Sequence, residues 1–469
     1  MERERDVLVI GAGISGLACA FFAREAGLSV AVLEEAPFAG GKIRSDWHDG
    51  FCYEWGPQGF LDNVPETLEL VRLAGLEGRL VRASDAAAGR FILRDGRLRR
   101  VPFSPKAFLT SDILTFSGKL RVFLEPFIPK GAANDESVAN FARRRIGREA
   151  AEVLVDAMVT GVYAGKAEEL SLPATFPKMA EMERTYGSLT RAMLALGKRA
   201  RGGPAGPGGT LCTFTGGMQE LPEALARQLA GVLHLSTKVA KVSFIPEKHT
   251  PWVVQLASGD VLESRALVCT MPPAKAAELL ASLLPTPALD ALRSIPSPPL
   301  VVVMMAYRSP QPFTHPLQGF GFLVPSREPR AILGTLFCHA IFPHQAPQGA
   351  VLLRTILGGA RQPSVIQFEN EDLVRLVRRE LHAVLGGDPD PSFVRIVRHP
   401  EGIPQYTLGH LQRLAVIDEA VAAFPGLYLT GNGYRGVAVN ACIAEAQRVA
   451  QQLKTQLAAN LQRESYVPT

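Results

Sequence analysis

Three glycines and one acid near the start of the chain have the types and the spacing of a dinucleotide site. Gly11, Gly13 and Gly16 form a Gly-x-Gly-x-x-Gly pattern, and Glu34 follows 18 residues after the last of them. Glycines let backbone amides approach a pyrophosphate at a helix N-terminus, and a carboxylate at this distance accepts hydrogen bonds from a ribose. A Cβ at Gly11 or Gly13 is expected to occupy the space that the pyrophosphate needs. The pattern therefore predicts dinucleotide binding.

The elements around this pattern form one βαβ unit. Residues 6–10 are an apolar, β-branched run that predicts a strand buried on both faces. A helical stretch is predicted from the end of the glycine pattern to about residue 26, and a second strand over residues 29–33. Residues 7–23 form an uncharged run, and the length of this run is close to that of a membrane span. Because the glycine turn inside them exposes backbone groups that lipid cannot satisfy, we expect no span here.

Further glycine-rich turns indicate that the cofactor is an extended molecule. A doublet at residues 40–41, a Gly-Pro-Gln-Gly segment at residues 56–59 and a turn at residues 214–219 all allow close backbone approach. A simple nicotinamide dehydrogenase would continue into alternating strands and helices instead. Residues 431–443 join a glycine-rich loop to a predicted helix start. This second anion-stabilising site suits the pyrimidine edge of a reduced flavin.

The composition is typical of a globular protein with a large core. Of 469 residues, 47% are hydrophobic and 20% are charged, which argues against disorder, collagen and coiled coils. The net charge of +5 is spread along the chain rather than gathered in a stripe, so no nucleic-acid partner is expected. The six cysteines show neither disulfide-framework nor metal-ligand spacing, so we expect a reducing compartment and no metal site. The charged start of the chain predicts no signal peptide.

The rest of the chain divides into a helical block and a strand-rich block. Helices are expected to open at Ser111 and Asn134 and to run over residues 148–162. The helical block carries large apolar residues at amphipathic spacing, which favour either a helical core or a surface that docks on lipid: Phe108, Leu109, Phe116, Leu120, Phe123 and Phe127. Residues 199–210 predict a flexible linker. Strands are expected over residues 239–244, 252–256, 266–270, 300–306, 351–356, 394–397 and 427–431, followed by a helix over residues 440–457.

Several segments together resemble the protoporphyrinogen IX oxidase family, within the flavin amine oxidase superfamily. They are Gly-Val-Tyr-Ala-Gly at residues 161–165, Ile-Pro-Gln-Tyr-Thr-Leu-Gly-His at residues 403–410 and Gly-Val-Ala-Val-Asn at residues 436–440. The glycine pattern at residues 11–16 is shared by the whole superfamily, whereas the second and third segments are much more specific. The resemblance covers essentially the whole chain.

The resemblance implies a mixed α/β fold with three parts. A Rossmann-like FAD-binding domain would comprise residues 1–87, 212–285 and 405–469, and a mixed-sheet substrate-binding domain residues 88–103 and 286–404. A helical membrane-docking domain would comprise residues 104–211, with the linker at its end. The implied activity is the six-electron oxidation of protoporphyrinogen IX by non-covalently bound FAD, with O2 as acceptor and H2O2 as product, in haem biosynthesis. The implied location is cytoplasmic and peripheral on a membrane, and a homodimer is compatible with it.

The resemblance also assigns site residues. Those implied to contact FAD are Gly11, Ala12, Gly13, Ile14, Ser15, Gly16, Glu34, Lys42, Gly56, Pro57, Gln58, Gly59, Val239, Asn432, Val437, Ala438 and Val439. Those implied to contact the tetrapyrrole are Arg90, Leu323, Leu336 and Ile356. Arg90 suits the chemistry because a guanidinium binds a propionate through two parallel hydrogen bonds, and apolar walls suit a flat macrocycle. No protein side chain is assigned as a catalytic acid or base, since the flavin carries the redox chemistry.

Departures from the family pattern leave some points open. Ala441 stands where the family usually has Asp, and Ile356 stands where some members have an aromatic residue; we expect Asn440 to cap the last helix nevertheless. Tyr406 and His410 are expected to be structural rather than catalytic. Cys442 lies in a motif unlike those of covalent flavoproteins.

Other functions remain open on the sequence. The alternatives are oxidation of coproporphyrinogen III, an amine oxidase or a carotenoid desaturase on the same fold, and a flavoprotein scaffold or porphyrin carrier without activity. No motif for the aromatic cage of an amine oxidase is found.

Overall fold

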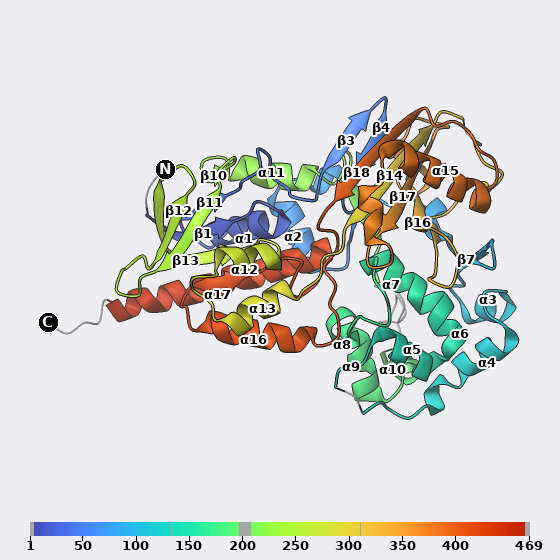
Figure 1. Cartoon of the computed structure of the whole chain (residues 1–469), viewed down its shortest axis with the longest axis horizontal. Helices are drawn as coiled ribbons and strands as arrows, with labels where there is room; N and C mark the ends of the chain where they lie inside the picture. Colours follow the sequence, from blue (N-terminus) through green and yellow to red (C-terminus); the bar gives the residue numbers. More distant parts are fainter. Residues whose placement is uncertain (1–3, 133, 197–207, 310, 465–469) are drawn as a thin grey trace.

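The computed structural model describes residues 4–132, 134–196, 208–309 and 311–464. Two large sheets lie side by side, and a group of helices lies below the second of them in the view of Figure 1. Most of the predicted linker, residues 199–210, falls outside the described residues. The mixed α/β fold class is confirmed.

The first sheet contains the predicted βαβ unit at its centre. Its strand order is β10 (Leu233–His234), β2 (Val30–Leu33), β1 (Glu4–Ile10), β13 (Val261–Cys269), β12 (Trp252–Leu256) and β11 (Val239–Phe244). A further strand, β19 (Leu427–Leu429), pairs with the C-terminal end of β13. β10, β2, β1, β13 and β19 are parallel, whereas β11 and β12 form an antiparallel extension. Parallel strands need cover on both faces.

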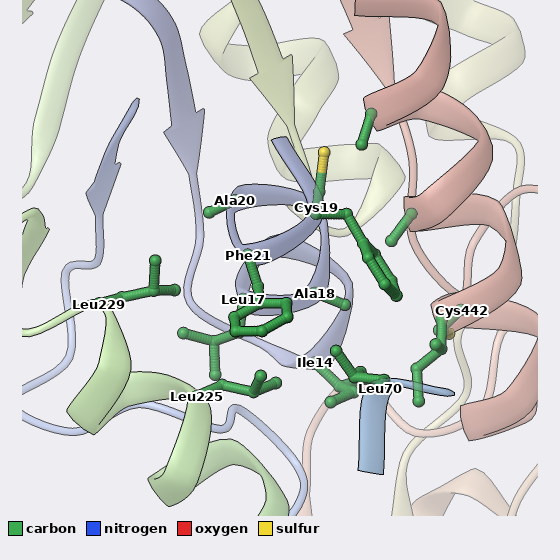
Figure 2. Close-up of a cluster of buried hydrophobic side chains, with 14 of the residues drawn as sticks. Ile14, Leu17, Ala18, Cys19, Ala20, Phe21, Leu70, Leu225, Leu229 and Cys442 are labelled. Atoms are coloured by element: carbon green, nitrogen blue, oxygen red, sulfur yellow. The ribbon is translucent and has the colours of Figure 1, made fainter. Parts of the chain in front are cut away.

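Helices provide that cover. One face packs on α1 (Ile14–Glu25), α2 (Pro65–Leu73), α11 (Glu220–Gln228) and the long α17 (Val439–Glu464). Figure 2 shows this core, with Leu17 and Phe21 of α1 between the side chains of α11 and α17. The other face packs on α12 (Pro273–Leu279), α13 (Thr286–Arg293) and α16 (His410–Ala422).

The second sheet is mixed and carries the residues expected to bind substrate. Its order is β18 (Phe393–His399), β14 (Leu300–Tyr307), β17 (Val351–Gly358), β16 (Ile332–Phe337), β15 (Gly321–Leu323), β7 (Arg90–Arg94) and β8 (Arg97–Arg100). Only the β15–β7 pair is parallel. One face packs on α15 (Asn370–Leu385). The other meets the hairpin of β3 (Ser45–His48) and β4 (Phe51–Glu54) at one end and the helix group at the other.

The helix group follows β8 in the chain. It comprises α3 (Pro105–Thr110), α4 (Phe116–Phe123), α5 (Val138–Ile146), α6 (Arg148–Ala150), α7 (Asp156–Tyr163), α8 (Leu172–Thr175), α9 (Pro177–Tyr186) and α10 (Leu189–Leu196). A fully buried ion pair between Arg145 and Glu125 lies at its centre. The helix predicted over residues 148–162 exists, with a π-helical turn at Ala151–Val155 between α6 and α7.

Two small elements complete the fold, a three-stranded sheet that packs with the core of the first sheet and a short helix that packs on the second. A three-stranded sheet is formed by β5 (Phe60–Leu61), β9 (Leu211–Phe214) and β6 (Leu80–Arg82), and α14 (Cys338–Ile341) follows β16.

The helix expected to open at Ser111 is a wrong prediction. Ser111 instead ends α3, and α4 starts after Thr115, whose hydroxyl accepts from the Gly118 N–H. Both residues are of capping type. Thr115 is the cap because Glu149 accepts its N–H at 2.8 Å and fixes it in place.

Candidate functional site

The three motif glycines lie in one turn but meet different surroundings. A Cβ on Gly16 would overlap the carbonyl oxygen of Gly11, so Gly16 lets α1 pack on the end of β1. Gly11 has φ +100°, and a Cβ there would lie 2.6 Å from the Thr270 hydroxyl. Only at Gly13 is there no protein atom within 4 Å of a Cβ. The room expected for a pyrophosphate therefore lies at Gly13, whereas the constraint found at Gly11 is the Thr270 side chain.

Glu34 is placed to fix this turn. Its Oε2 accepts the N–H of Ala12 at 2.7 Å, and its Oε1 accepts the N–H of Ala36 at 2.9 Å. Each carboxylate oxygen can accept a further bond, so the group can serve the turn and a ribose together. The N–H of Thr237 donates to the Glu34 carbonyl oxygen at 2.7 Å, which brings the start of β11, with Val239, to this end of the site.

The glycine doublet and Lys42 lie against the same turn. Gly40 donates its N–H to the Ala12 carbonyl oxygen at 2.8 Å. Lys42 Nζ donates to the Gly402 carbonyl oxygen at 2.7 Å. The Lys42 side chain is exposed, yet dense surrounding protein lowers the pKa of its ammonium group.

The segment at residues 56–59 is held close to Lys42. A Cβ on Gly56 would overlap the Lys42 carbonyl oxygen, and one on Gly59 would overlap the carbonyl oxygen of Cys212. Gln58 was assigned to the cofactor, but its buried side chain donates to Gln345 Oε1 at 2.7 Å. Any contact that Gln58 makes with a cofactor must therefore come from its backbone.

Glu54 and Arg354 form a buried cluster that the sequence did not single out. The Glu54 carboxylate accepts the N–H of Met218 at 2.8 Å and the hydroxyl of Ser45 at 2.7 Å, and burial raises its pKa to about 7. Arg354, on β17, donates to the carbonyl oxygens of Glu54 and Gly56 at 3.3 and 2.6 Å. The cluster thus ties two glycine-rich turns to the second sheet.

The C-terminal loop and the start of α17 form the other end of the site. Asn432 and Val437 lie in the loop, Ala438 precedes the helix and Val439 is its first residue. The first backbone bond within α17 runs from Cys442 N to Ala438 O at 3.0 Å. The N–H groups before Cys442 are consequently not used inside the helix, which makes this end attractive to an anion.

Two expectations for this segment have clear outcomes. Asn440 does not cap α17, since the helix begins one residue earlier; its side chain donates to the Leu61 carbonyl oxygen at 2.8 Å instead. Cys442 is buried and burial raises its pKa to about 11. Its thiol therefore stays protonated near neutral pH, a poor state for covalent attachment.

The four predicted substrate residues share one face of the second sheet. Arg90 and Leu336 lie opposite Gly321 on its two sides, and Leu323 and Ile356 lie opposite Gly334 on its two sides. Paired residues share a face, as do residues two apart on a strand. The register therefore places all four on the same side, in two neighbouring rows.

These positions are also the open ones. Leu323, Leu336 and Ile356 are each the only residue of their strand that is not buried. Arg90, which lies on the other side of Gly321 from Leu336, is exposed. Within the described residues Arg90 has no ion-pair partner and lies over the Phe320 ring, 5.2 Å from its centre. An apolar surface with one unpaired guanidinium at its end suits a flat apolar molecule that carries a carboxylate.

A second exposed surface lies on the helix group. We call it the apolar patch, and its residues, all at least 48% exposed, are Phe103, Leu109, Phe116, Leu120, Phe123 and Phe127. Phe108, which the sequence placed in this set, is half-buried and packs edge-on against Phe123. Within the described ranges no helix has both the length and the apolar run needed to cross a bilayer.

Comparison with known proteins gives relatives along nearly the whole chain. Residues 14–454 match the family described as flavin containing amine oxidoreductase. Coproporphyrinogen III oxidase of Bacillus subtilis (strain 168) is 30% identical, covering 97% of this chain and 99% of that protein. The chloroplastic protoporphyrinogen oxidase of Nicotiana tabacum is 33% identical, covering 96% of this chain and 85% of that protein. A solved structure from Exiguobacterium sp. 255-15, a candidate protoporphyrinogen oxidase, has a TM-score of 0.82 at 25% identity, covering 97% of this chain and 99% of that one.

Proposed function

The chain belongs to the family of flavin-containing amine oxidoreductases, and from this premise we propose that it oxidises protoporphyrinogen IX to protoporphyrin IX with O2 as acceptor. FAD is its cofactor and, when bound, supplies the oxidising power of the reaction. What the protein contributes is orientation of the substrate, exclusion of water and a fixed place for the flavin.

The observation that carries this proposal is the face formed by Leu323, Leu336, Ile356 and Arg90. Three strands that are otherwise buried each leave one apolar side chain open on it. A tetrapyrrole offers a broad apolar ring system, which binds mainly by area, and propionates that an arginine recognises. Arg354, which pairs with Leu336 in the same row of this sheet, donates to the turn at Gly56, so the substrate face is held next to the flavin site.

For the cofactor, we assign FAD contacts to the turn at residues 11–16, to Glu34, Lys42 and Val239, to residues 56–59, and to Asn432 and residues 437–439. The open room at Gly13 and the unused N–H groups at the start of α17 support two anion positions at the two ends of an extended molecule. The absence of charge at Ala441 removes one acid from the flavin end of this site.

We propose the three-part division with one boundary moved, and the packing supports it. Residues 90–100 join residues 300–399 in the second sheet, in agreement with a substrate-binding part. However, Ala288, Leu292 and Ile295 pack with α12 and α16 on the first sheet. We therefore place the boundary after Ile295 rather than at residue 286.

We further propose that the apolar patch docks on a membrane surface. Its exposed phenylalanines and leucines lie on α3, α4 and the turns beside them. Such a surface buries apolar area in the interfacial region of a bilayer without crossing it. Docking there would suit an enzyme whose apolar substrate partitions into lipid.

A second substrate, coproporphyrinogen III, is favoured by one finding: the Bacillus subtilis relative of that name matches nearly the full length of both chains. The deciding experiment is O2 uptake and porphyrin fluorescence with both porphyrinogens on the purified holoprotein. A higher kcat/KM for protoporphyrinogen IX supports the main proposal, and a higher value for coproporphyrinogen III selects the second. Turnover of amines with neither porphyrinogen oxidised would overturn both.

A further inference from the structure

We propose that Tyr406 is a positioning residue that holds the flavin-side loop, residues 432–436, and links its position to the helix group. The inference deepens the proposed function, because it rests on the placement of the flavin against this loop and the start of α17. The loop needs an external support, since it lies between two glycines of positive φ, Gly431 at +130° and Gly436 at +136°.

The hydroxyl of Tyr406 supplies that support at both ends of the loop. Tyr406 Oη donates to the Asn432 carbonyl oxygen at 2.7 Å and accepts the Gly436 N–H at 2.7 Å. The side chain is buried, and burial raises the pKa of the phenol, so the hydroxyl keeps the proton that it donates. One phenol thus closes the loop from inside and leaves the opposite side of the loop for the flavin.

His410 strengthens this support by stacking on one face of the Tyr406 ring. The Tyr406 and His410 rings are stacked at 4.1 Å with 15° between their planes. His410 Nε2 lies 2.8 Å from the Tyr434 carbonyl oxygen, which can only accept, so this nitrogen carries the proton. Burial lowers the pKa of His410 to about 4, which keeps the ring neutral near pH 7. The pair therefore contacts the loop at three alternate residues, Asn432, Tyr434 and Gly436, without adding charge.

The same ring connects the loop to the helix group. Tyr163 of α7 packs edge-on against Tyr406, with ring centres 6.0 Å apart. The Tyr406 carbonyl oxygen accepts the N–H of Ser171 at 2.9 Å, just before α8. α7 is also the helix against which Leu323 packs, through Gly161. Tyr406 consequently lies between the flavin-side loop and the helix that borders the substrate face.

Tyr406 is a positioning residue and not a catalytic one, because both of its hydroxyl bonds are made within the protein. Removing the hydroxyl leaves the partly buried carbonyl of Asn432 and the partly buried N–H of Gly436 without their partner, which frees the loop rather than removing a reacting group. We therefore expect the change to act on flavin binding and on the environment of the flavin ring.

The test compares Tyr406→Phe with a matched Tyr→Phe variant in the same aromatic cluster. Tyr163→Phe removes a hydroxyl that donates to the Thr175 carbonyl oxygen at 3.2 Å and has no bond to the loop. For Tyr406→Phe we expect the Kd of FAD, measured from flavin released as the holoenzyme is diluted, to rise about tenfold. We also expect the visible absorption bands of the bound oxidised flavin to move toward those of free FAD. For Tyr163→Phe we expect both readouts to match the wild type.

A third variant, Ala438→Asp, tests whether the flavin lies beside the start of α17, independently of the role of Tyr406. Ala438 is exposed beside the start of α17, and an aspartate there would add a negative charge next to the flavin. If Ala438→Asp leaves the flavin spectrum unchanged, the placement itself is wrong and the inference goes with it. If Ala438→Asp shifts the spectrum but Tyr406→Phe does not, or Tyr163→Phe shifts it equally, the role of Tyr406 alone is overturned.

Discussion

Arg354 Nη2 donates to the carbonyl oxygen of Gly56 at 2.6 Å, which joins the central region of the second sheet to a turn 298 residues away in the chain. Arg354 of β17 pairs with Leu336 of the neighbouring strand β16. Gly56 lies against the backbone of Lys42. One buried guanidinium therefore fixes the relation between the proposed substrate face and the proposed flavin site. It is held there by carbonyl oxygens rather than by a direct ion pair.

Arg354→Met should lower the free energy of unfolding by about 2–4 kcal/mol, because the carbonyl oxygens of Glu54 and Gly56 lose a charged donor inside the protein. Denaturant unfolding of the flavin-free protein measures this. Arg375→Met is the control, since Arg375 is exposed on α15, and should stay within about 0.5 kcal/mol of the wild type. Equal losses in the two variants would contradict the role of Arg354.

Glu54 should make stability fall as the pH rises toward 7. Burial raises its pKa to about 7 in the folded protein, against 4.5 for a glutamate in water. Between these two values the folded state binds more protons than the unfolded state, so rising pH favours unfolding by up to about 3 kcal/mol. Unfolding free energies at pH 5 and pH 7.5 should therefore differ less in Glu54→Gln than in the wild type. The same difference in both proteins would show that Glu54 is not the group that titrates.

Local sequence was enough to predict the βαβ unit, since strand, turn, helix and acid all lie within residues 4–34 and their partners are neighbours in the chain. Arg354 could not be found in this way. Its role depends on a carbonyl oxygen 298 residues away, and a carbonyl leaves no residue type to recognise. The placement of Leu323 and Ile356 on one face likewise depends on strand register, which no short pattern reveals.

The exact residues at which α17 and α4 begin could not be predicted from the sequence either. The sequence predicts Asn440 as the cap of α17 because its side chain is of capping type, yet its amide donates to the carbonyl oxygen of Leu61 in the distant strand β5. Ser111 and Thr115 are both capping residues, and the choice between them depends on Glu149. In each case a tertiary partner decides between two locally acceptable starts.

Gly13→Ala and Gly16→Ala should fail in different ways. Gly13 has φ −68° and ψ 176°, which alanine adopts readily, and no protein atom blocks its Cβ. The flavin-free protein should keep its stability within about 0.5 kcal/mol, while the Kd of FAD rises at least about tenfold. Gly16→Ala should instead lose about 2 kcal/mol or more before FAD is added, because its Cβ overlaps the Gly11 carbonyl. Normal FAD binding by Gly13→Ala would remove the pyrophosphate from this turn.

Phe116 and Phe127 should control membrane docking. They are 84% and 78% exposed, so replacing both by serine should change the unfolding free energy by less than about 1 kcal/mol. Flotation with anionic liposomes should show the wild type at the top of the gradient and the double variant mostly at the bottom. Leu411→Ser, an exposed leucine on α16, is the control and should float like the wild type. Flotation of the double variant would place the membrane contact elsewhere.

Arg90 offers the sharpest test of the substrate assignment. Its guanidinium is exposed, has no ion-pair partner among the described residues, and shares a row with Leu336. A contact with a propionate would be similar in the ground state and in the transition state, so Arg90→Ala should raise KM roughly tenfold or more and change kcat little. Arg90→Lys should recover only part of the loss, because an ammonium group cannot form two parallel hydrogen bonds with a carboxylate. Arg97→Ala, an exposed arginine on the neighbouring strand β8, should leave KM unchanged. Flavin content measured in parallel separates substrate binding from cofactor loss, and an unchanged KM in Arg90→Ala would mean that another cation receives the carboxylate.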